Sequence, residues 1–220
     1  MEKNKIKILI PSHNEIRTLK KICLDLRNLN FDLLVVDDNS DDGTLSWLKK
    51  NSFNFIRNKK NIGYEKSIIV GIKYLLKKKT TIYIVTFDAD GEHQIKDLKK
   101  IRKILKNNKV DMIIGNRDKL NRWTEYLLSF LFLIKFGIRD PLSGLKVYSA
   151  NKLRLLQHKI KDNCFMVDLI ILFKEKNFSL KNITINVKKR NDSSRINNNF
   201  LVNLKILKLI KYLKLSLYKK

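Results

Sequence analysis

The sequence predicts an α/β domain built on a mostly parallel sheet flanked by helices. Short runs rich in Ile, Leu and Val lie at 6–10, 33–36 and 82–87, and each is bounded by polar turns. Runs of this kind are typical of buried parallel strands. Between them lie longer segments of helical character, and this alternation calls for right-handed crossovers and a parallel sheet. The 220 residues fit one domain with a sizeable core.

The first half of the chain alternates strictly between the two kinds of element. Strands are expected at 5–10, 32–37, 53–57, 81–87 and 110–114, and helices at 15–29, 41–51, 62–78 and 95–107. After residue 115 the alternation breaks down. A helix at 122–137 is followed by a strand at 145–148, helices at 149–157 and 165–176, a strand at 180–187 and a helix in the last twenty residues. We expect this second half to form a cap over the sheet edge, facing a second substrate.

Composition limits the possible partners. Lys and Arg exceed Asp and Glu by 47 − 21 = 26, which favours nucleic acid, an anionic membrane or phosphorylated ligands. AT-rich coding bias would give the same excess of lysine. The lysines are spread over helix faces without the Arg–aromatic interleaving of single-strand binders, so we expect no nucleic acid.

Hydrophobic segments, the N-terminus and the cysteines all indicate an intracellular protein. The stretches free of charged residues are far shorter than the roughly 20 residues of a spanning helix. The N-terminus has no signal-peptide profile, so we expect a cytoplasmic protein. Cys23 and Cys164 lie far apart without metal-ligand spacing, which favours two reduced thiols.

Carboxylates follow the predicted strands. In open α/β sheets, ligands bind beyond the carboxyl ends of the strands. Asp88 and Asp90 are two residues apart, so on extended backbone their side chains point the same way and repel each other unless a cation lies between them. Mg²⁺ or Mn²⁺ suits such a pair when phosphate oxygens complete its shell. Helix-capping aspartates are the alternative.

A second acidic pair ends the strand at 32–37. Asp37 or Asp38 can accept hydrogen bonds from a ribose hydroxyl or a base N–H, as the acid of dinucleotide folds does. A helix cap is the alternative for one of the two.

These segments together resemble a known family. The pieces are IPSHNE at 10–15, VVDDNSDDGT at 35–44, NIG at 61–63, DADGEH at 88–93, GNR at 115–117, DPLSGLK at 140–146, and the basic residues Arg190 and Arg195. Their order and spacing are similar to those of inverting family 2 glycosyltransferases of the GT-A fold, in the branch of dolichol-phosphate-mannose-synthase-like and polyprenyl-phosphate glycosyltransferases. The resemblance covers about residues 5–195. It implies a GT-A domain at 1–195, Rossmann-like, followed by a helical C-terminal extension at 196–220.

The resemblance implies roles for individual residues. Nucleotide-sugar binding would involve Pro11, His13, Asn14, Glu15, Asp37, Asp38, Asp88, Arg190 and Arg195. The metal, Mg²⁺ or Mn²⁺, would be held by Asp88, Asp90 and Glu92, with Asp90 the direct ligand. The acceptor would meet Arg117, Arg122 and Ser143. Asp90, Arg117 and Asp168 would be catalytic, with Asp168 at a position where the family carries an acid.

Three positions depart from the family pattern. His13 replaces an aromatic residue, Glu92 replaces a frequent glutamine, and Leu145-Lys146 replaces Phe-Arg. A histidine ring can still stack on a base. An added carboxylate at position 92 either binds the metal or weakens the electrostatics of the site. The lysine leaves the role of the family arginine open.

Two acceptor classes remain open. A phosphate monoester such as polyprenyl phosphate is already an anion and needs no general base, whereas a sugar hydroxyl does, and Asp168 is then the candidate base. The predicted function is metal-dependent transfer from a UDP- or GDP-linked sugar to polyprenyl phosphate. The alternative is extension of a surface polysaccharide or glycan at a hydroxyl. More remote are a non-catalytic nucleotide-sugar binder and a nucleic-acid-binding protein.

The C-terminal segment predicts a basic amphipathic helix. Lys205, Lys208, Lys211 and Lys214 recur every third residue, which keeps residues 205–213 polar on one side and apolar on the other. Such a helix can lie on an anionic membrane, and packing against its own domain is the other interpretation. We expect a peripheral protein on the cytoplasmic face of a membrane.

Overall fold

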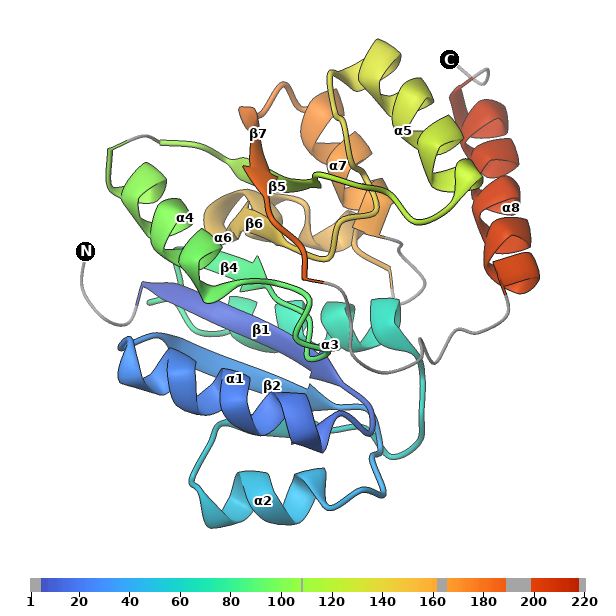
Figure 1. The fold of residues 1–220 in the computed structure, drawn as a ribbon. Helices are drawn as coiled ribbons and strands as arrows, with labels where there is room; N and C mark the ends of the chain where they lie inside the picture. The colour runs from blue at the N-terminus through green and yellow to red at the C-terminus, as the bar shows by residue number, and fades with distance from the viewer. Residues whose placement is uncertain (1–4, 108, 162–165, 189–198, 218–220) are drawn as a thin grey trace.

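The computed structural model describes residues 5–107, 109–161, 166–188 and 199–217. Within these residues, a seven-stranded sheet has the order β3-β2-β1-β4-β6-β5-β7 (Figure 1). The strands are β1 Ile6–Ser12, β2 Asp32–Asp37, β3 Phe55–Arg57, β4 Tyr83–Thr86, β5 Met112–Arg117, β6 Lys146–Ser149 and β7 Leu180–Ile185. The helices are α1 Ile16–Asn28, α2 Thr44–Lys50, α3 Tyr64–Leu76, α4 Ile95–Asn107, α5 Trp123–Phe136, α6 Ala150–Leu155, α7 Met166–Glu175 and α8 Asn199–Leu217.

The first half forms the parallel part of the sheet. β1 pairs in parallel with both β2 and β4, and β2 pairs in parallel with β3. Each strand lies within a few residues of its predicted range. β1, β2 and β4 are buried on both faces, as expected for near-continuous apolar runs between two helical layers.

The second half is an extension of the same sheet, so the expected cap is wrong in that respect. β6 lies between β4 and β5 and runs antiparallel to both, and β7 then pairs in parallel with β5. The free side of β4 needs a partner for its backbone groups, and β6 provides it; β6 in turn pairs with β5. α5, α7 and α8 pack over this part (Figure 1).

The two faces of the sheet bury separate apolar clusters. One holds residues of α3, α5, α6, α7 and α8, and the other holds residues of α1, α2 and α4. Gly71 allows α3 to approach the sheet closely, since a Cβ atom there would lie 2.2 Å from Leu9 Cδ1. The helices therefore cover both faces of the sheet and leave the ends of the strands accessible.

The C-terminal helix α8 packs against α5. Ile206 and Ile210 are buried in the same cluster as Leu128 and Phe132 of α5. Of the two interpretations of its amphipathic pattern, packing on the domain accounts for this apolar face. Lys205, Lys208 and Lys211 are exposed on the opposite side. Every helix of the described residues is too short or too polar to cross a bilayer.

Candidate active site

The candidate site lies at the carboxyl ends of β1, β2 and β4. Because the three strands are parallel, their carboxyl ends meet, and Ser12 at the end of β1 is in register with Asp37 at the end of β2. The segments that follow these strands carry most of the predicted donor-site residues. Parallel topology therefore brings them to one edge, as the sequence predicts.

A small cavity of about 170 Å³ lies at the ends of β1 and β2 and at the start of α3. The His13 ring lies beside β2, with Nδ1 2.9 Å from the carbonyl oxygen of Asp38. The lining consists of Pro11, Ser12, His13, Asp38, Asn61, Gly63, Tyr64 and Ser67. A flat imidazole, an apolar proline and a carboxylate around one hollow suit a planar heterocycle that carries N–H donors.

Asp37 and Asp38 have different environments. The Asp38 carboxylate accepts hydrogen bonds from the backbone N–H groups of Ile62 and Gly63, at 2.9 and 2.8 Å, and from the Asn58 side chain at 2.8 Å. It therefore fixes the 58–63 loop against the cavity that it also lines. Asp37 is fully buried, accepts the Ser40 N–H at 3.0 Å and lies 3.7 Å from Arg57. The structure places Asp38 at the cavity and Asp37 beneath it.

Asn14 and Glu15 lie at the turn between β1 and α1. Asn14 adopts a left-handed backbone with φ of 53°. Its N–H donates to Ser40 Oγ at 2.9 Å and its side-chain oxygen accepts the Asp41 N–H at 2.8 Å. Asn tolerates this conformation better than most residues. These two hydrogen bonds hold the β1–α1 turn against the turn after β2. Glu15 follows Asn14 as the N-cap of α1.

Asp88 is clamped by two protein donors. The Tyr64 hydroxyl donates to Oδ1 at 2.6 Å, and His93 Nε2 lies 2.9 Å from Oδ2. Burial opposes the charge of Asp88, but His93 and the two hydrogen bonds hold its pKa below the usual value. Burial also disfavours a charged His93, yet Asp88 raises the pKa of that ring. Gly144 is required beside this carboxylate, because a Cβ atom there would lie 2.0 Å from Asp88 Oδ2.

Asp90 is held differently. β4 ends at Thr86, so residues 88–91 form a turn rather than the extended backbone assumed for the Asp-x-Asp pattern. One Asp90 oxygen accepts the Glu92 N–H at 3.0 Å. Burial, and then the charge of Asp88, raise the pKa of Asp90 to about 6. Because its surroundings disfavour the charged form, a nearby dication would stabilise the Asp90 carboxylate.

The acidic turn fits a metal ion bound mainly through a ligand. Among the described residues no group of three or more His, Cys, Asp or Glu side chains is arranged to hold a metal. Mg²⁺ or Mn²⁺ needs only one or two protein carboxylates when phosphate oxygens fill the other positions. Asp90, with Glu92 two residues on, supplies that number, and both oxygens of Asp88 are engaged by Tyr64 and His93.

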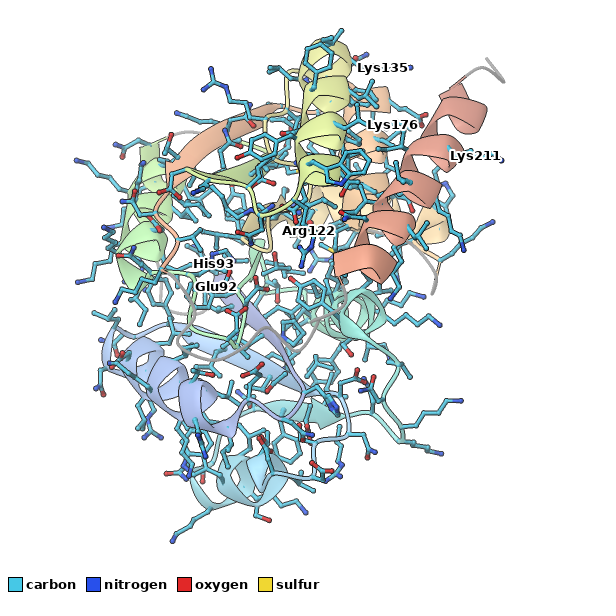
Figure 2. All side chains as sticks on the ribbon, turned by 45° about the vertical axis from the view of Figure 1, so that its right-hand side comes forward. Glu92, His93, Arg122, Lys135, Lys176 and Lys211 are labelled. Atoms are coloured by element: carbon cyan, nitrogen blue, oxygen red, sulfur yellow. The ribbon has the colours of Figure 1, made fainter. Side chains whose placement is uncertain are left out.

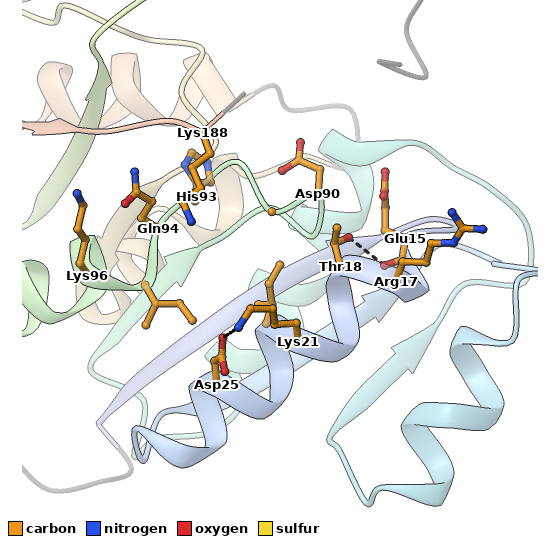
Figure 3. A pocket seen from close by; sticks show the side chains of 13 residues that line it. Glu15, Arg17, Thr18, Lys21, Asp25, Asp90, His93, Gln94, Lys96 and Lys188 are labelled. Atoms are coloured by element: carbon orange, nitrogen blue, oxygen red, sulfur yellow. Dashed lines mark hydrogen bonds and ion pairs between the residues drawn. The ribbon is translucent and has the colours of Figure 1, made fainter. Parts of the chain in front are cut away.

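A larger cavity of about 530 Å³ runs from this turn along α1 and α4. Figure 3 shows Asp90 and Glu15 toward one end and Lys96 toward the other. Thr18 ties the two walls together, since its hydroxyl donates to the Ala89 carbonyl at 2.5 Å. Glu15 and Asp90 thus share one cavity although they follow different strands.

Arg117 and Arg122 belong to a buried ion-pair network. Arg117 donates to both oxygens of Asp140, at 2.7 and 3.0 Å, and to Glu125 at 3.1 Å. Arg122 donates to the other oxygen of Glu125 at 2.7 Å. Burial opposes the charge of Arg117, but Asp140 and Glu125 raise its pKa further. Ser143, the third predicted acceptor residue, is buried in the following turn. Arg117 therefore fixes the 140–144 turn.

Sequence reasoning missed two coupled charges beside the site, the buried Lys146 and the half-buried Glu65. Lys146 at the start of β6 is almost fully buried, and its ammonium donates to the Ser143 carbonyl. Burial lowers the pKa of Lys146 to about 8, against Glu65, Asp140 and Asp88, which favour its charge. Burial raises the pKa of Glu65 to about 7, and Lys146 opposes that rise. Lys146 is one of the departures from the family pattern, but no local pattern in the chain points to the influence of Glu65 on it.

Glu65 connects this charge to Asp168. Its carboxylate accepts the N–H of Met166, the first residue of α7, at 2.9 Å. Asp168 lies in the first turn of α7, and its charge adds to the rise in the pKa of Glu65. The predicted loop residues Arg190 and Arg195 lie outside the described residues.

The comparison with protein families decides the identity. The sequence pattern described as glycosyl transferase family 2 matches residues 7–164, which include the cavity and the acidic turn. The chain belongs to glycosyl transferase family 2. It is a glycosyltransferase, as the motifs predict.

Characterised relatives place this family 2 member in the predicted branch. The chain is 26% identical to a UDP-N-acetylglucosamine–dolichyl-phosphate N-acetylglucosaminyltransferase of Methanococcus voltae over 186 residues, 71% of this chain and 74% of that protein. It is 27% identical to an undecaprenyl-phosphate mannosyltransferase of Micrococcus luteus, over 67% of this chain and 68% of that protein. The resemblance to polyprenyl-phosphate glycosyltransferases is thereby confirmed.

Solved structures confirm the fold of this family 2 enzyme. Glucosyl-3-phosphoglycerate synthase from Mycobacterium tuberculosis, crystallised with Mn²⁺, UDP-glucose and phosphoglyceric acid, superimposes with a TM-score of 0.66 at 14% identity. The match covers 87% of this chain and 73% of that one. The mostly parallel sheet flanked by helices is therefore the GT-A fold.

Proposed function

We propose that this glycosyltransferase transfers a sugar from a UDP- or GDP-linked donor to polyprenyl phosphate, with Mg²⁺ or Mn²⁺, at the cytoplasmic face of a membrane. One observation carries the proposal. Tyr64, which lines the smaller cavity together with Asp38, donates its hydroxyl to Asp88, two residues before Asp90 in the acidic turn. A base-sized hollow therefore lies next to a cation-binding turn.

The donor half of the site suits a nucleotide diphosphate. The heterocycle would lie against His13 and Pro11, with Asp38 as the acceptor for its N–H or for ribose. Asp90 and Glu92 would hold the dication, which neutralises charge on the leaving diphosphate. Arg190 and Arg195 would add positive charge over the diphosphate. The M. voltae relative, a UDP-N-acetylglucosamine–dolichyl-phosphate N-acetylglucosaminyltransferase, supports a nucleotide-sugar donor.

Polyprenyl phosphate suits the acceptor half. An oxygen of its phosphate would attack the anomeric carbon, and the bond to the diphosphate would break with its electron pair leaving on the diphosphate. A phosphate monoester carries no proton that must be removed at neutral pH. Arg122 would face the acceptor from the N-cap of α5, with Ser143 and the Arg117-braced turn beside it.

The experiment screens radiolabelled UDP- and GDP-sugars against a short-chain polyprenyl phosphate in detergent, with and without chelator. We expect a lipid-linked product that chelator abolishes and that Mg²⁺ or Mn²⁺ restores. Transfer that proceeds unchanged in chelator would disprove metal dependence. Transfer only to saccharide hydroxyls would replace the acceptor with a glycan.

Asp168→Asn distinguishes the two acceptor classes. With a phosphate acceptor no base is needed, so we expect kcat to stay within about threefold of the wild type. A hydroxyl acceptor would need the carboxylate, and kcat would then fall by about 10²-fold or more with donor binding intact. The measurement is kcat beside the donor Kd, because unchanged binding shows that α7 keeps its place.

A further inference from the structure

Helix α5 exposes a continuous apolar face. At 100° per residue its exposed side chains fall within one sector of about 120°. Ile134 is 70% exposed and Trp123 is 61% exposed. The face consists of Trp123, Tyr126, Leu127, Phe130, Leu133 and Ile134. Single exposed apolar residues are ordinary, but a contiguous set of this size marks an interaction surface.

The opposite side of α5 is fully used by the domain. Thr124, Glu125, Leu128 and Phe132 are buried, and the last two belong to the core cluster. α8 covers part of this side, since Ile206 and Ile210 pack there and Thr124 Oγ1 donates to Asn203 at 2.6 Å. These contacts fix the orientation of α5, so its apolar face is directed toward solvent.

The exposed charges that α5 and α8 themselves carry are all positive. α8 contains no Asp or Glu, and the one acid of α5, Glu125, is buried between Arg117 and Arg122. Lys135 and Lys211 extend outward from α5 and α8 (Figure 2). Neighbouring helices lie roughly 8–10 Å apart, close to the Debye length at physiological salt. The lysines of α8 therefore act on whatever covers α5.

An anionic bilayer is the occupant that fits both properties. Trp and Tyr favour the membrane–water interface, where an apolar ring and a polar group are both satisfied. A helix of 14 residues is about 21 Å long, too short to span the roughly 30 Å hydrocarbon core. It suits a position flat in the interface. A second copy is disfavoured, because each chain carries +26 and would bring its lysines against those of its partner.

We propose that the exposed face of α5 is the membrane-docking surface of this protein, with α8 as its support and basic flank. From sequence, membrane contact is expected of the basic helix at 205–213, with the apolar segment 126–136 contributing. The structure buries the apolar side of α8 against α5 and leaves the face of α5 exposed. Docked in this way, Trp123 enters the interface directly beside Arg122, the N-cap of α5. Resting on the proposed function, this places a lipid-borne phosphate at the acceptor side.

The experiment uses Trp123 as a probe in the full chain. The sequence has two tryptophans, and Trp47→Phe leaves Trp123 alone. Mixed with vesicles of phosphatidylcholine containing about 30% phosphatidylglycerol, this variant should show a blue shift of its emission and should co-sediment. We expect pure phosphatidylcholine vesicles, or about 1 M salt, to weaken both signals, because surface attraction is screened.

A matched pair of variants localises the contact. Phe130→Ser with Ile134→Ser should weaken co-sedimentation at least tenfold, since each removes a large apolar side chain from the interface (about 1.4 kcal/mol is tenfold). Leu155→Ser changes a side chain that is 64% exposed on α6, and it should bind as the wild type does. No blue shift, equal binding of both variants, or a concentration-dependent dimer that shields Trp123 would each overturn the proposal.

Neither the donor sugar nor polyprenyl phosphate is present in this assay. Loss of vesicle binding therefore tests the surface alone, whereas the transfer assay in detergent tests the reaction alone. Vesicle binding without transfer would leave the surface standing and reject the acceptor.

Discussion

At the residue scale, the two carboxylates of the Asp-x-Asp turn have different tasks. Asp88 receives Tyr64 and His93 and touches the backbone at Gly144, so it joins three segments. Asp90 has a raised pKa and lies at the larger cavity. We infer that Asp88 positions the turn and that Asp90 is the direct metal ligand.

Asp90→Asn should stabilise the metal-free protein above neutral pH. The folded pKa, about 6, lies above the ordinary value of 3.8. The contribution of the protonated carboxyl to stability is therefore complete below about pH 4 and is lost as pH rises through about 6. We expect the variant to gain on the order of 2 kcal/mol of unfolding free energy at pH 7.5 and almost none at pH 4. Thermal unfolding with chelator at both pH values measures this.

The same substitution should abolish metal-dependent turnover. Asp90 is the proposed ligand, so its loss should weaken binding of the dication that would neutralise the leaving group. We expect kcat at fixed Mn²⁺ to fall by about 10²-fold or more. The control is Glu175→Gln, an exposed acid at the end of α7. A near-normal rate for Asp90→Asn would show that the metal assignment is wrong.

Side-chain direction is what the sequence could not predict at this scale. It placed Asp37 and Asp38 correctly at the end of β2, because apolar runs mark strands well. It left open which of the two lines the cavity, since that depends on the 58–63 loop and on Arg57. The role of Tyr64 was equally hidden, because its contact with Asp88 spans 24 residues.

At the element scale, Lys146 of β6 and Glu65 of α3 influence each other through opposite charge, and Glu65 accepts the N–H of Met166 at the start of α7. Lys146→Met leaves the half-buried Glu65 without the nearby cation that favours its charged form, and we expect a loss of about 1–2 kcal/mol in unfolding free energy at pH 7.5. Adding Glu65→Gln removes that uncompensated charge and should restore about half of the loss. Urea denaturation of the four proteins of this cycle gives the coupling energy.

Strictly additive effects would contradict the pairing. The Gln side chain can still accept the Met166 N–H, so the cap on α7 is kept and the cycle isolates charge. Lys146→Arg, which restores the residue common in the family, provides a second check. It should retain the coupling that Lys146→Met loses.

The ranges of the elements were predictable, but one arrangement was not. Periodicity located β6 and β7 within two residues, yet it gave no information on pairing partners. The position of β6 between β4 and β5 depends on contacts between residues about 60 apart in sequence. Long-range pairing of this kind leaves no local pattern, and for that reason sequence reasoning predicts a cap where the structure has further strands of the sheet.

At the scale of the whole molecule, α8 belongs to the core that it covers. The predicted boundary at 195/196 stays a prediction, and truncation after residue 198 tests it. Removing α8 exposes the surfaces that bury Ile206 and Ile210, and we expect a loss of about 3–6 kcal/mol in unfolding free energy. Thermal unfolding of the truncated and full chains measures it. Equal stability would show that residues 1–195 are an independent domain.

The amphipathic pattern of α8 illustrates a limit on sequence reasoning. An apolar stripe facing lysines suits a bilayer and a domain surface equally well. Only the position of α5 decides between them, and α5 is about 80 residues away in sequence. The helix itself was predicted correctly, while its partner depended on the complete fold.

The reversed strand β6 has a consequence for how this enzyme can diversify. Because β6 runs opposite to β4, it begins where β4 ends, and Lys146 stands opposite Thr86. The 140–144 turn is thereby anchored under Asp88, and the excursion through α5 leaves the sheet at the end of β5 and returns at the start of β6. That excursion, which carries the proposed membrane-docking face, can lengthen or shorten in evolution without disturbing the segments that follow β1, β2 and β4. The antiparallel strand β6 thus separates the segments that carry the candidate nucleotide site from the segment that carries α5.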